Sequence, residues 1–151
     1  MAKYKLLNRK AIKEILALIK QQWGAEIDLD YAVLQDTKNK IYLINKKIAE
    51  IDLDKLRVNS MGIYFGLITN NELRLSIEGS EIIGPQAKKN IIELTEEQKK
   101  AWLRGEDIEF NHNDETFVLL KYNFDFLGTG KYKQGKILNY VPKERRLRVN
   151  N

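Results

Sequence analysis

The first regular pattern in the chain is a stripe of apolar residues near its amino end. Between residues 9 and 23, apolar side chains recur at the three- and four-residue spacing of one helix face. Asn8 precedes this stretch, and asparagine is a favoured N-cap residue. Gly24 follows it and suits a C-terminal cap. The pattern predicts a helix from about Asn8 to Trp23, with the apolar stripe Ile12, Ile15, Leu16, Ile19 and Trp23.

The next part of the chain changes to strand-like runs separated by turn residues. These runs predict strands at 31–35, 41–45, 61–69 and 73–77. Residues 36–40 suit a hairpin loop, and Asn70 and Asn71 suit a tight turn between the last two strands. Residues 48–58 alternate too poorly for an assignment. We therefore expect the first part of the chain to be a helix packed on a small antiparallel sheet.

After residues 78–85 the organisation changes again. A short strand at 91–94 leads to Thr95, which forms a capping-box pattern with Gln98 for a helix that ends near Arg104 and Gly105. Further strands are predicted at 107–110, 116–122, 126–133 and 136–141, joined by short polar turns. Short strands at close spacing indicate a small barrel or closed sheet.

Composition limits the chemistry that this sequence can support. The 151 residues are 43% hydrophobic and 31% charged, which is typical of a globular chain. They include no cysteine and one histidine, His112, which excludes disulfides, thiolate metal sites and cysteine nucleophiles. His112 lies in a turn-like stretch, where we expect it to be exposed and without function. No long apolar run or secretory signal is present, so we expect no membrane span and a cytoplasmic location.

Charge is distributed unevenly along the chain. Residues 1–23 carry a net charge of +5, residues 24–120 carry −6, and residues 121–151 carry +6. If folding brings the two basic ends to one side, the molecule has a positive face that attracts phosphates.

The most basic stretch is the segment from residue 128 to residue 148. It holds seven lysines or arginines against a single acid, Glu144, and two tyrosines lie among them. In a strand, Lys131 and Lys133 would share one face and Tyr132 the other. Apolar residues recur through the segment, so it is expected to pack on a core and hold its charges in place. We interpret the segment as a nucleic-acid-binding surface, and the alternative is a solvated terminus that serves solubility.

Four motifs, in this order, resemble a known RNA-binding domain. They are Leu-Arg-Leu-Ser-Ile-Glu-Gly-Ser at 73–80, the capped helix ending in Trp-Leu-Arg-Gly-Glu at 102–106, Phe-Leu-Gly-Thr-Gly-Lys at 126–131, and Leu-Asn-Tyr-Val-Pro-Lys-Glu-Arg-Arg at 138–146. The order resembles the PUA domain at the C-terminus of Sun/Fmu-type RNA cytosine methyltransferases, and the pre-PUA plus PUA pair of ribosome-biogenesis factors.

This resemblance implies an α+β protein of two modules. Residues 1–72 would form a pre-PUA-like module of a helix and an antiparallel sheet, and residues 73–151 a PUA-like β pseudo-barrel. It also implies binding of structured rRNA or tRNA without a catalytic site, cofactor or metal of its own. The catalytic half of those methyltransferases, with its glycine-rich cofactor loop and its cysteine, has no counterpart in this sequence.

The resemblance and the basic segment together predict the RNA-contacting residues. The predicted set is Arg74, Gly79, Lys131, Lys133, Lys136, Asn139, Tyr140, Lys143, Arg145, Arg146 and Arg148. Nearby aromatic rings could stack on unpaired bases or pack in a barrel core. We assign Phe117, Phe124 and Phe126 to the core and leave Tyr132 and Tyr140 open.

Two other motifs have the spacing of chemical sites. Residues 130–136 match the spacing of a phosphate-binding loop, but Ile137 stands where a hydroxyl is needed, so Gly135 is better interpreted as a turn. The pairs Asp28 with Asp30 and Asp52 with Asp54 could hold a hard cation, although surface charge explains them more simply. The predicted partners of the chain are structured RNA and a separate RNA methyltransferase or other modification enzyme. The alternative function is a protein-interaction subunit of such an enzyme.

Overall fold

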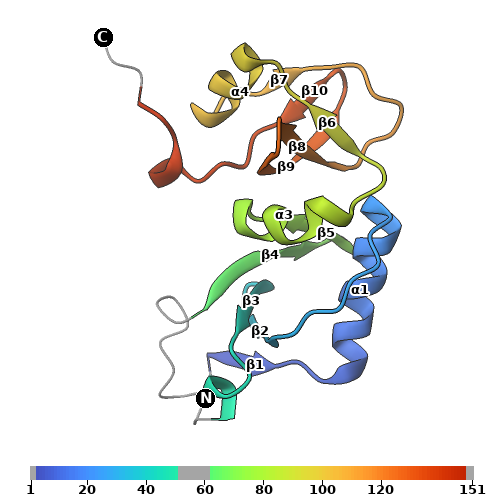
Figure 1. The fold of residues 1–151 in the computed structure, drawn as a ribbon, viewed down its shortest axis with the longest axis vertical. Coiled ribbons are helices and arrows are strands. Elements are labelled where there is room, and N and C mark those ends of the chain that lie inside the picture. Colours follow the sequence, from blue (N-terminus) through green and yellow to red (C-terminus); the bar gives the residue numbers. More distant parts are fainter. Residues whose placement is uncertain (1–2, 51–61, 149–151) are drawn as a thin grey trace.

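Two modules are stacked along the long axis of the molecule (Figure 1). The structure is a computed structural model, and it describes residues 3–50 and 62–148. The first module holds a sheet of strand order β1-β2-β3-β4-β5, and the second holds a sheet of order β6-β8-β9-β10-β7. All pairings are antiparallel except that of β6 with β8. The predicted α+β class is confirmed.

The first module follows the predicted order of elements. Its elements are β1 (Tyr4–Leu6), α1 (Arg9–Trp23), β2 (Ala32–Asp36), β3 (Lys40–Ile44), a 3-10 turn (Ile48–Glu50), β4 (Ile63–Thr69) and β5 (Glu72–Leu75). Strand β1 was not predicted, because it has three residues and only Tyr4 is buried. The unassigned stretch 48–58 lies outside the described residues from position 51 onward, as does Met61.

Helix α1 begins and ends at the predicted caps. The Asn8 side chain accepts a hydrogen bond from the Ala11 backbone N–H at 2.9 Å. Gly24 adopts a left-handed conformation with φ of 68°, which closes the helix through its N–H to the Lys20 carbonyl. The helix covers one face of the first sheet (Figure 1) and buries Ile15, Ile19 and Trp23 there.

The second module contains two helices and five short strands. Its elements are α3 (Ile77–Ile83), a 3-10 turn (Gly84–Gln86), β6 (Ile91–Glu93), α4 (Glu96–Leu103), β7 (Ile108–Glu109), β8 (Phe117–Tyr122), β9 (Asp125–Lys133), β10 (Lys136–Leu138) and a 3-10 turn (Lys143–Arg145). The capping box of Thr95 and Gln98 at the start of α4 is present as predicted. Strands β6 and β7 end the second sheet, as in a pseudo-barrel that backbone pairing does not close.

Helix α3 corrects the prediction of a strand at 73–77. Strand β5 ends at Leu75, and Ser76 caps the helix by accepting the Gly79 N–H at 2.9 Å. The alternating pattern of these residues fits a strand, but the serine side chain offers the backbone a helical start. Gly79 is buried in the first turn of α3, where an added Cβ would clash with the Phe65 carbonyl oxygen.

One hydrophobic core runs through the boundary between the modules. Ile19 and Trp23 of α1 belong to the same buried cluster as Phe117, Leu119 and Phe126 of the second sheet. A further cluster around Trp102 fills the second module. Strand β5 (Glu72–Leu75) pairs in the first sheet beyond the expected boundary at residue 72, and the division at that point stays a prediction.

The aromatic assignments are corrected at one position. Phe117 and Phe126 are buried as predicted, and Tyr132 is buried as well. Phe124, assigned to the core, is 93% exposed. Tyr122 and Asp125 are paired residues of β8 and β9, so Asn123 and Phe124 form the two-residue turn and the phenylalanine points outward.

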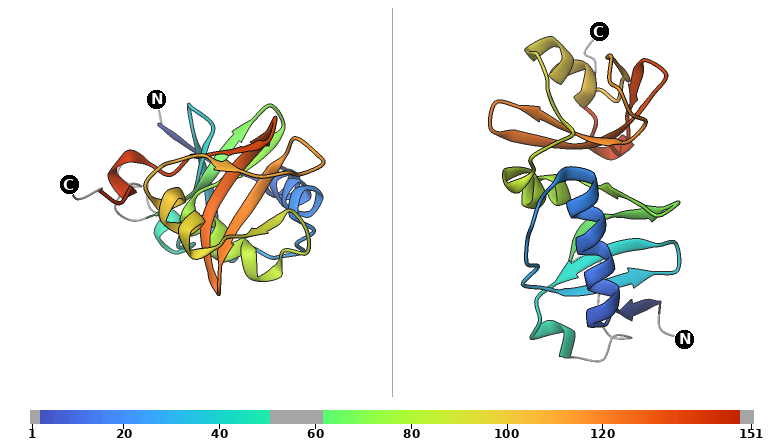
Figure 2. Two further views of the ribbon diagram at one scale, coloured as in Figure 1. Left: turned by 90° about the horizontal axis from the view of Figure 1, so that it is seen from above. Right: turned by 90° about the vertical axis from the view of Figure 1, so that its right-hand side faces the viewer.

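The two basic ends of the chain do not form one platform. Helix α1 and the segment after β10 lie on opposite sides of the molecule in Figure 1, and the view from above in Figure 2 agrees. The expectation of a shared positive face is therefore wrong. It fails because α1 packs its apolar stripe on the first sheet, whereas the carboxyl segment is hydrogen-bonded to α4 in the second module.

Candidate nucleic-acid interface

The β9–β10 hairpin carries two adjacent lysines. Lys133 and Lys136 are directly paired across the hairpin, and both are exposed. Gln134 and Gly135 form its turn with positive φ, which confirms Gly135 as a turn residue. Within the described part of the chain, neither lysine pairs with a carboxylate. Like charges that face each other across strands repel, so this turn would be stabilised by a bound anion.

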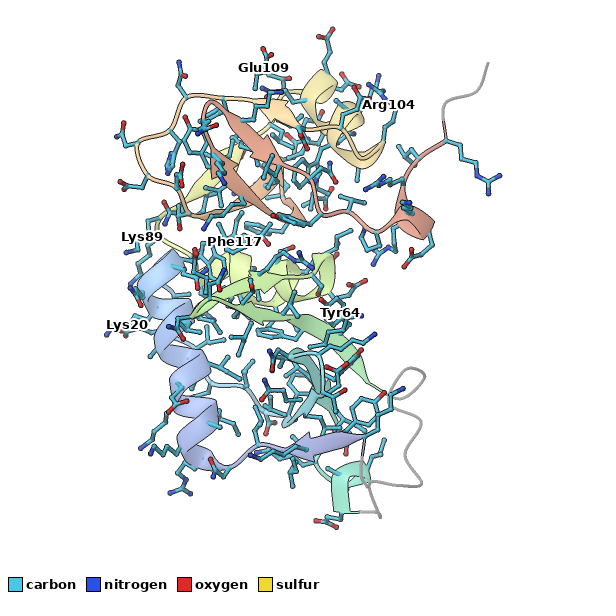
Figure 3. The ribbon with its side chains drawn as sticks, turned by 180° about the vertical axis from the view of Figure 1, so that it is seen from behind. Lys20, Tyr64, Lys89, Arg104, Glu109 and Phe117 are labelled. Carbon is cyan, nitrogen blue, oxygen red and sulfur yellow. The ribbon has the colours of Figure 1, made fainter. Side chains whose placement is uncertain are left out.

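Lys131 lies on the same strand but in a different environment. Its ammonium contacts both carboxylate oxygens of Glu72, at 2.7 and 2.9 Å, and lies 4.8 Å from the centre of the Phe117 ring. Figure 3 places Phe117 at the junction of the two modules. The charge of Lys131 is thus balanced inside the protein, and it connects β9 to β5.

Asn139 and Gly79 perform structural tasks. The Asn139 amide donates to the carbonyl oxygens of Trp102 and Glu106, both at 2.8 Å, and its side-chain oxygen accepts the Val141 N–H. These bonds hold the carboxyl segment against α4. Gly79 is buried against Phe65, as described above. Their predicted contact with RNA has no support from these positions and stays a prediction.

The carboxyl segment packs on the second module up to residue 147. Arg145 pairs with Glu78 at the start of α3, and the Arg146 side chain donates to the Val141 carbonyl at 2.9 Å. The Leu147 N–H donates to the Leu103 carbonyl at 2.8 Å. The segment is therefore ordered by contacts, as the sequence predicted. Lys143 and Arg148 are exposed and form no ion pair with a described carboxylate.

A cleft of about 610 Å³ opens between the two modules. Strands β4 and β5 and the start of α3 line one side, and residues 127–129, 140–142, 144 and 145 line the other. Arg74 stands 4.3 Å from the centre of the Tyr140 ring. Burial raises the pKa of Tyr64 above its usual value, and the charge of Arg74 with a hydrogen bond from it offsets part of the rise. Lys40 also lines the cleft, 5.8 Å from the Tyr64 ring centre.

Several residues of this interface were not predicted from the sequence. Glu72 and Glu78 neutralise two of the predicted cations, and Tyr64 and Lys40 complete the cleft. Figure 3 shows Tyr64 on the first module, facing the side of the molecule away from α1. No local pattern marks these residues, because the groups that they contact lie far away in the sequence.

Metal and membrane roles receive no support from the described residues. In that part of the chain no three histidine or acidic side chains gather as metal ligands, and Asp30 pairs with Lys46 at 3.2 Å. Asp52 and Asp54 lie outside the described residues. His112 is half-buried with its ring edge-on to Tyr132, which differs from the exposed position expected. None of the described helices combines the length and apolar character that a membrane crossing requires.

Comparison with known proteins assigns a class to the second module. Residues 89–147 match the family model described as the methyltransferase RsmF PUA domain. This match covers β6 through the carboxyl segment, and it confirms the resemblance to the PUA domain of RNA cytosine methyltransferases.

Individual relatives extend the similarity into the first module. The chain is 24% identical over 141 residues to the ribosomal RNA small subunit methyltransferase F of Vibrio vulnificus, covering 90% of this chain and 29% of the relative. The protein of the same name from Vibrio parahaemolyticus is 30% identical over 98 residues, which is 61% of this chain and 20% of the relative. That from Vibrio cholerae is 24% identical over 139 residues, or 91% and 29%. The chain thus spans less than a third of the length of these relatives.

Proposed function

We propose that this chain is an RNA-binding unit that docks on structured rRNA and serves rRNA modification without a catalytic site of its own. The observation that carries the proposal is the similarity to rRNA methyltransferases over 90% of the chain, which includes both modules. The similarity covers 29% of the relative. The activity in the name of the relative is therefore not transferred to this chain.

The exposed cations provide the physical basis for binding. Lys133, Lys136, Lys143 and Arg148 belong to the second module and lack ion-pair partners among the described residues. Such cations bind phosphates, release counterions and fix the position of a protein on RNA without reading sequence. A-form RNA is recognised largely by its shape, so these contacts suit a helical rRNA element.

The bound chain would position the RNA for a modification reaction that another protein catalyses. A separate RNA methyltransferase or another modification enzyme would act on the docked RNA, or the complex would assist ribosome assembly. A cytoplasmic location and an additional capacity for tRNA stay predictions from the sequence.

A salt titration tests this proposal. Affinity for rRNA hairpins and for tRNA is measured by gel shift from low to physiological salt, with a double-stranded DNA of equal length as the control for charge alone. We expect tighter binding to the rRNA hairpins and a steep linear fall of the logarithm of affinity with the logarithm of salt concentration. Absence of salt-sensitive RNA binding would contradict the proposal.

A second candidate function is docking to a modification enzyme through protein contacts. It is favoured by Phe124, which is 93% exposed and borders a cleft of about 340 Å³. An exposed aromatic ring of this kind is typical of the anchor residues of protein interfaces. Pull-down of a tagged RNA methyltransferase, with and without nuclease, separates the two functions. Capture that survives nuclease but is lost in Phe124→Ala supports the docking function, whereas loss with nuclease supports RNA binding.

A further inference from the structure

The cleft between the modules has rigid walls supplied by both sheets. The Thr129 hydroxyl of β9 donates to the Leu75 carbonyl of β5 at 3.0 Å. The Gly128 N–H donates to the Ser80 hydroxyl of α3 at 2.9 Å. The first bond joins the two modules and the second holds β9 on α3 within the second module, so both stabilise the walls of the cleft. Its volume of about 610 Å³ is in the range of sites that hold a small organic group.

The cleft presents a cation that no described carboxylate neutralises. Arg74 forms no ion pair among residues 3–50 and 62–148, and its guanidinium lies against the ring of Tyr140. Tyr140 is 37% exposed and borders the cleft together with Arg74. By contrast, Arg145 at the same cleft is paired with Glu78. Arg74, which also forms a hydrogen bond to Tyr64, therefore keeps a positive charge that no described carboxylate balances, whereas the charge of Arg145 is balanced by Glu78.

The chemistry of these walls suits a nucleobase more than a phosphate alone. A planar guanidinium supported by a tyrosine ring offers a stacking surface, and arginine also attracts the charge of the attached phosphate. Apolar side chains, among them Ile63, Leu75 and Leu127, also line the cleft. Two carboxylates line it as well, Glu144 and the Glu78 that pairs with Arg145. Lys40 adds a second cation at the rim on the side of the first module.

From this geometry we infer that the cleft binds one unpaired nucleotide of an RNA strand, with its base stacked on the Arg74 and Tyr140 pair. The inference rests on the proposed RNA binding and makes it more specific. Exposed cations of the second module hold the helical part of the RNA, and the cleft takes a nucleotide that the helix releases at a bulge or loop. Bound RNA would then contact both modules.

The test compares four probes by fluorescence. They are an RNA hairpin with one bulged 2-aminopurine, the same hairpin with an abasic bulge, the fully paired hairpin, and adenosine monophosphate added as a competitor of the bulged hairpin. We expect the protein to bind the 2-aminopurine bulge about tenfold more tightly than the abasic one, a typical contribution of one stacked base, and to quench its fluorescence. Adenosine monophosphate should compete only at far higher concentration. Competition at the concentration of the hairpin itself would mean a site for free nucleotides and would overturn the inference.

Variants separate stacking from charge and from folding. Arg74→Ala, Arg74→Lys and Tyr140→Leu should lose the preference for the base and the quenching, while affinity for the paired hairpin stays within about twofold. Tyr140→Phe should keep both properties because the ring is retained. Tyr122→Leu is the matched control. The ring centre of Tyr122 lies 4.3 Å from a lysine ammonium nitrogen, so it also pairs with a cation, but Tyr122 does not line the cleft. Equal affinity of the unmodified protein for bulged and abasic hairpins, or a preference kept in Arg74→Ala, would overturn the inference. Failure of the unmodified protein to bind any hairpin would instead contradict the proposed function.

Discussion

Strand β9 places lysines both at the junction between the modules and in the β9–β10 hairpin. The surroundings of these lysines differ. At the junction, Lys131 contacts both oxygens of Glu72 and is mostly shielded from solvent. Two residues further along, Lys133 is exposed beside Lys136 and has no described carboxylate partner. Both lysines of β9 lie in the same basic stretch of the sequence. They differ in the packing around the ammonium group of each.

This difference separates cations that stabilise the fold from cations available for binding. An ion pair that is partly buried stabilises a junction, and loss of one partner leaves the other uncompensated. An exposed lysine contributes little to folding, so its charge is free for a phosphate. By this criterion, Lys131 belongs to the fold, and Lys133 and Lys136 belong to the proposed RNA surface. Arg145 is paired with Glu78 but stays exposed, so its pair contributes little to stability.

The largest effect is expected from Gly79→Ala at the junction. The added methyl group would overlap the Phe65 carbonyl oxygen, so the free energy of unfolding should fall by about 3 kcal/mol. Urea denaturation measures it. Glu81→Ala, an exposed change in the same helix, should have little effect. If the Gly79→Ala variant is as stable as the unmodified protein but binds RNA more weakly, Gly79 contacts RNA directly and its role is not only structural.

Charge reversal at the hairpin comes next. The double change Lys133→Glu and Lys136→Glu should weaken RNA binding about thirtyfold at moderate salt and reduce its salt dependence, because two phosphate contacts are lost. The melting temperature should not fall. The control is Lys46→Glu with Lys47→Glu, on the first module. Equal losses from both pairs would mean that the hairpin has no special role.

A smaller loss of stability is expected from Lys131→Met. The change leaves the half-buried Glu72 carboxylate without its partner and should cost about 1.5 kcal/mol of unfolding free energy. The double variant with Glu72→Leu should recover part of this loss, and a double-mutant cycle measures the coupling. RNA affinity should change less than in the hairpin variants. A greater loss of RNA affinity than in those variants would assign Lys131 to the RNA surface.

The smallest effect is expected from Arg148→Ala at the end of the described chain. One exposed phosphate contact should contribute about two- to threefold in affinity, for all RNA sequences alike, and about one unit of the salt slope. Filter binding to two unrelated rRNA hairpins measures this. A loss confined to one hairpin would indicate base recognition instead.

Local signals predicted the elements that depend on neighbouring residues. Asn8 and Gly24 defined α1, and the pair Thr95 and Gln98 defined the start of α4. The order of motifs in the second half of the chain predicted the PUA-like module, which the family match over residues 89–147 supports. Caps and turns depend on a few neighbouring residues, and the order of motifs is a property of the sequence itself, so all of these can be interpreted without coordinates.

Features set by contact between the modules were not predicted. Helix α3 was missed because the alternating pattern of residues 73–77 was extended as a strand through its Ser76 cap. The need for Gly79 in this helix arises from the close approach of β4. Phe124 was placed in the core because the register of β8 and β9 was unknown. The neutralised state of Lys131 and Arg145 depends on acids of β5 and α3, far away in sequence. The missed ion pairs depend on long-range packing, whereas the exposure of Phe124 follows from the register of a single hairpin.

The second module caps the end of α1. This contact limits which part of the chain could be moved into another protein and still fold. The backbone N–H groups of Lys88 and Lys89 donate to the Trp23 carbonyl, and the Gln22 side chain is bonded to Leu73 on both its oxygen and its nitrogen. A gene fusion that transplanted only residues 89–147 would separate this helix end from its cap and expose Phe117 and Leu119. The two modules are therefore expected to fold together, and either one alone would lose part of its packing.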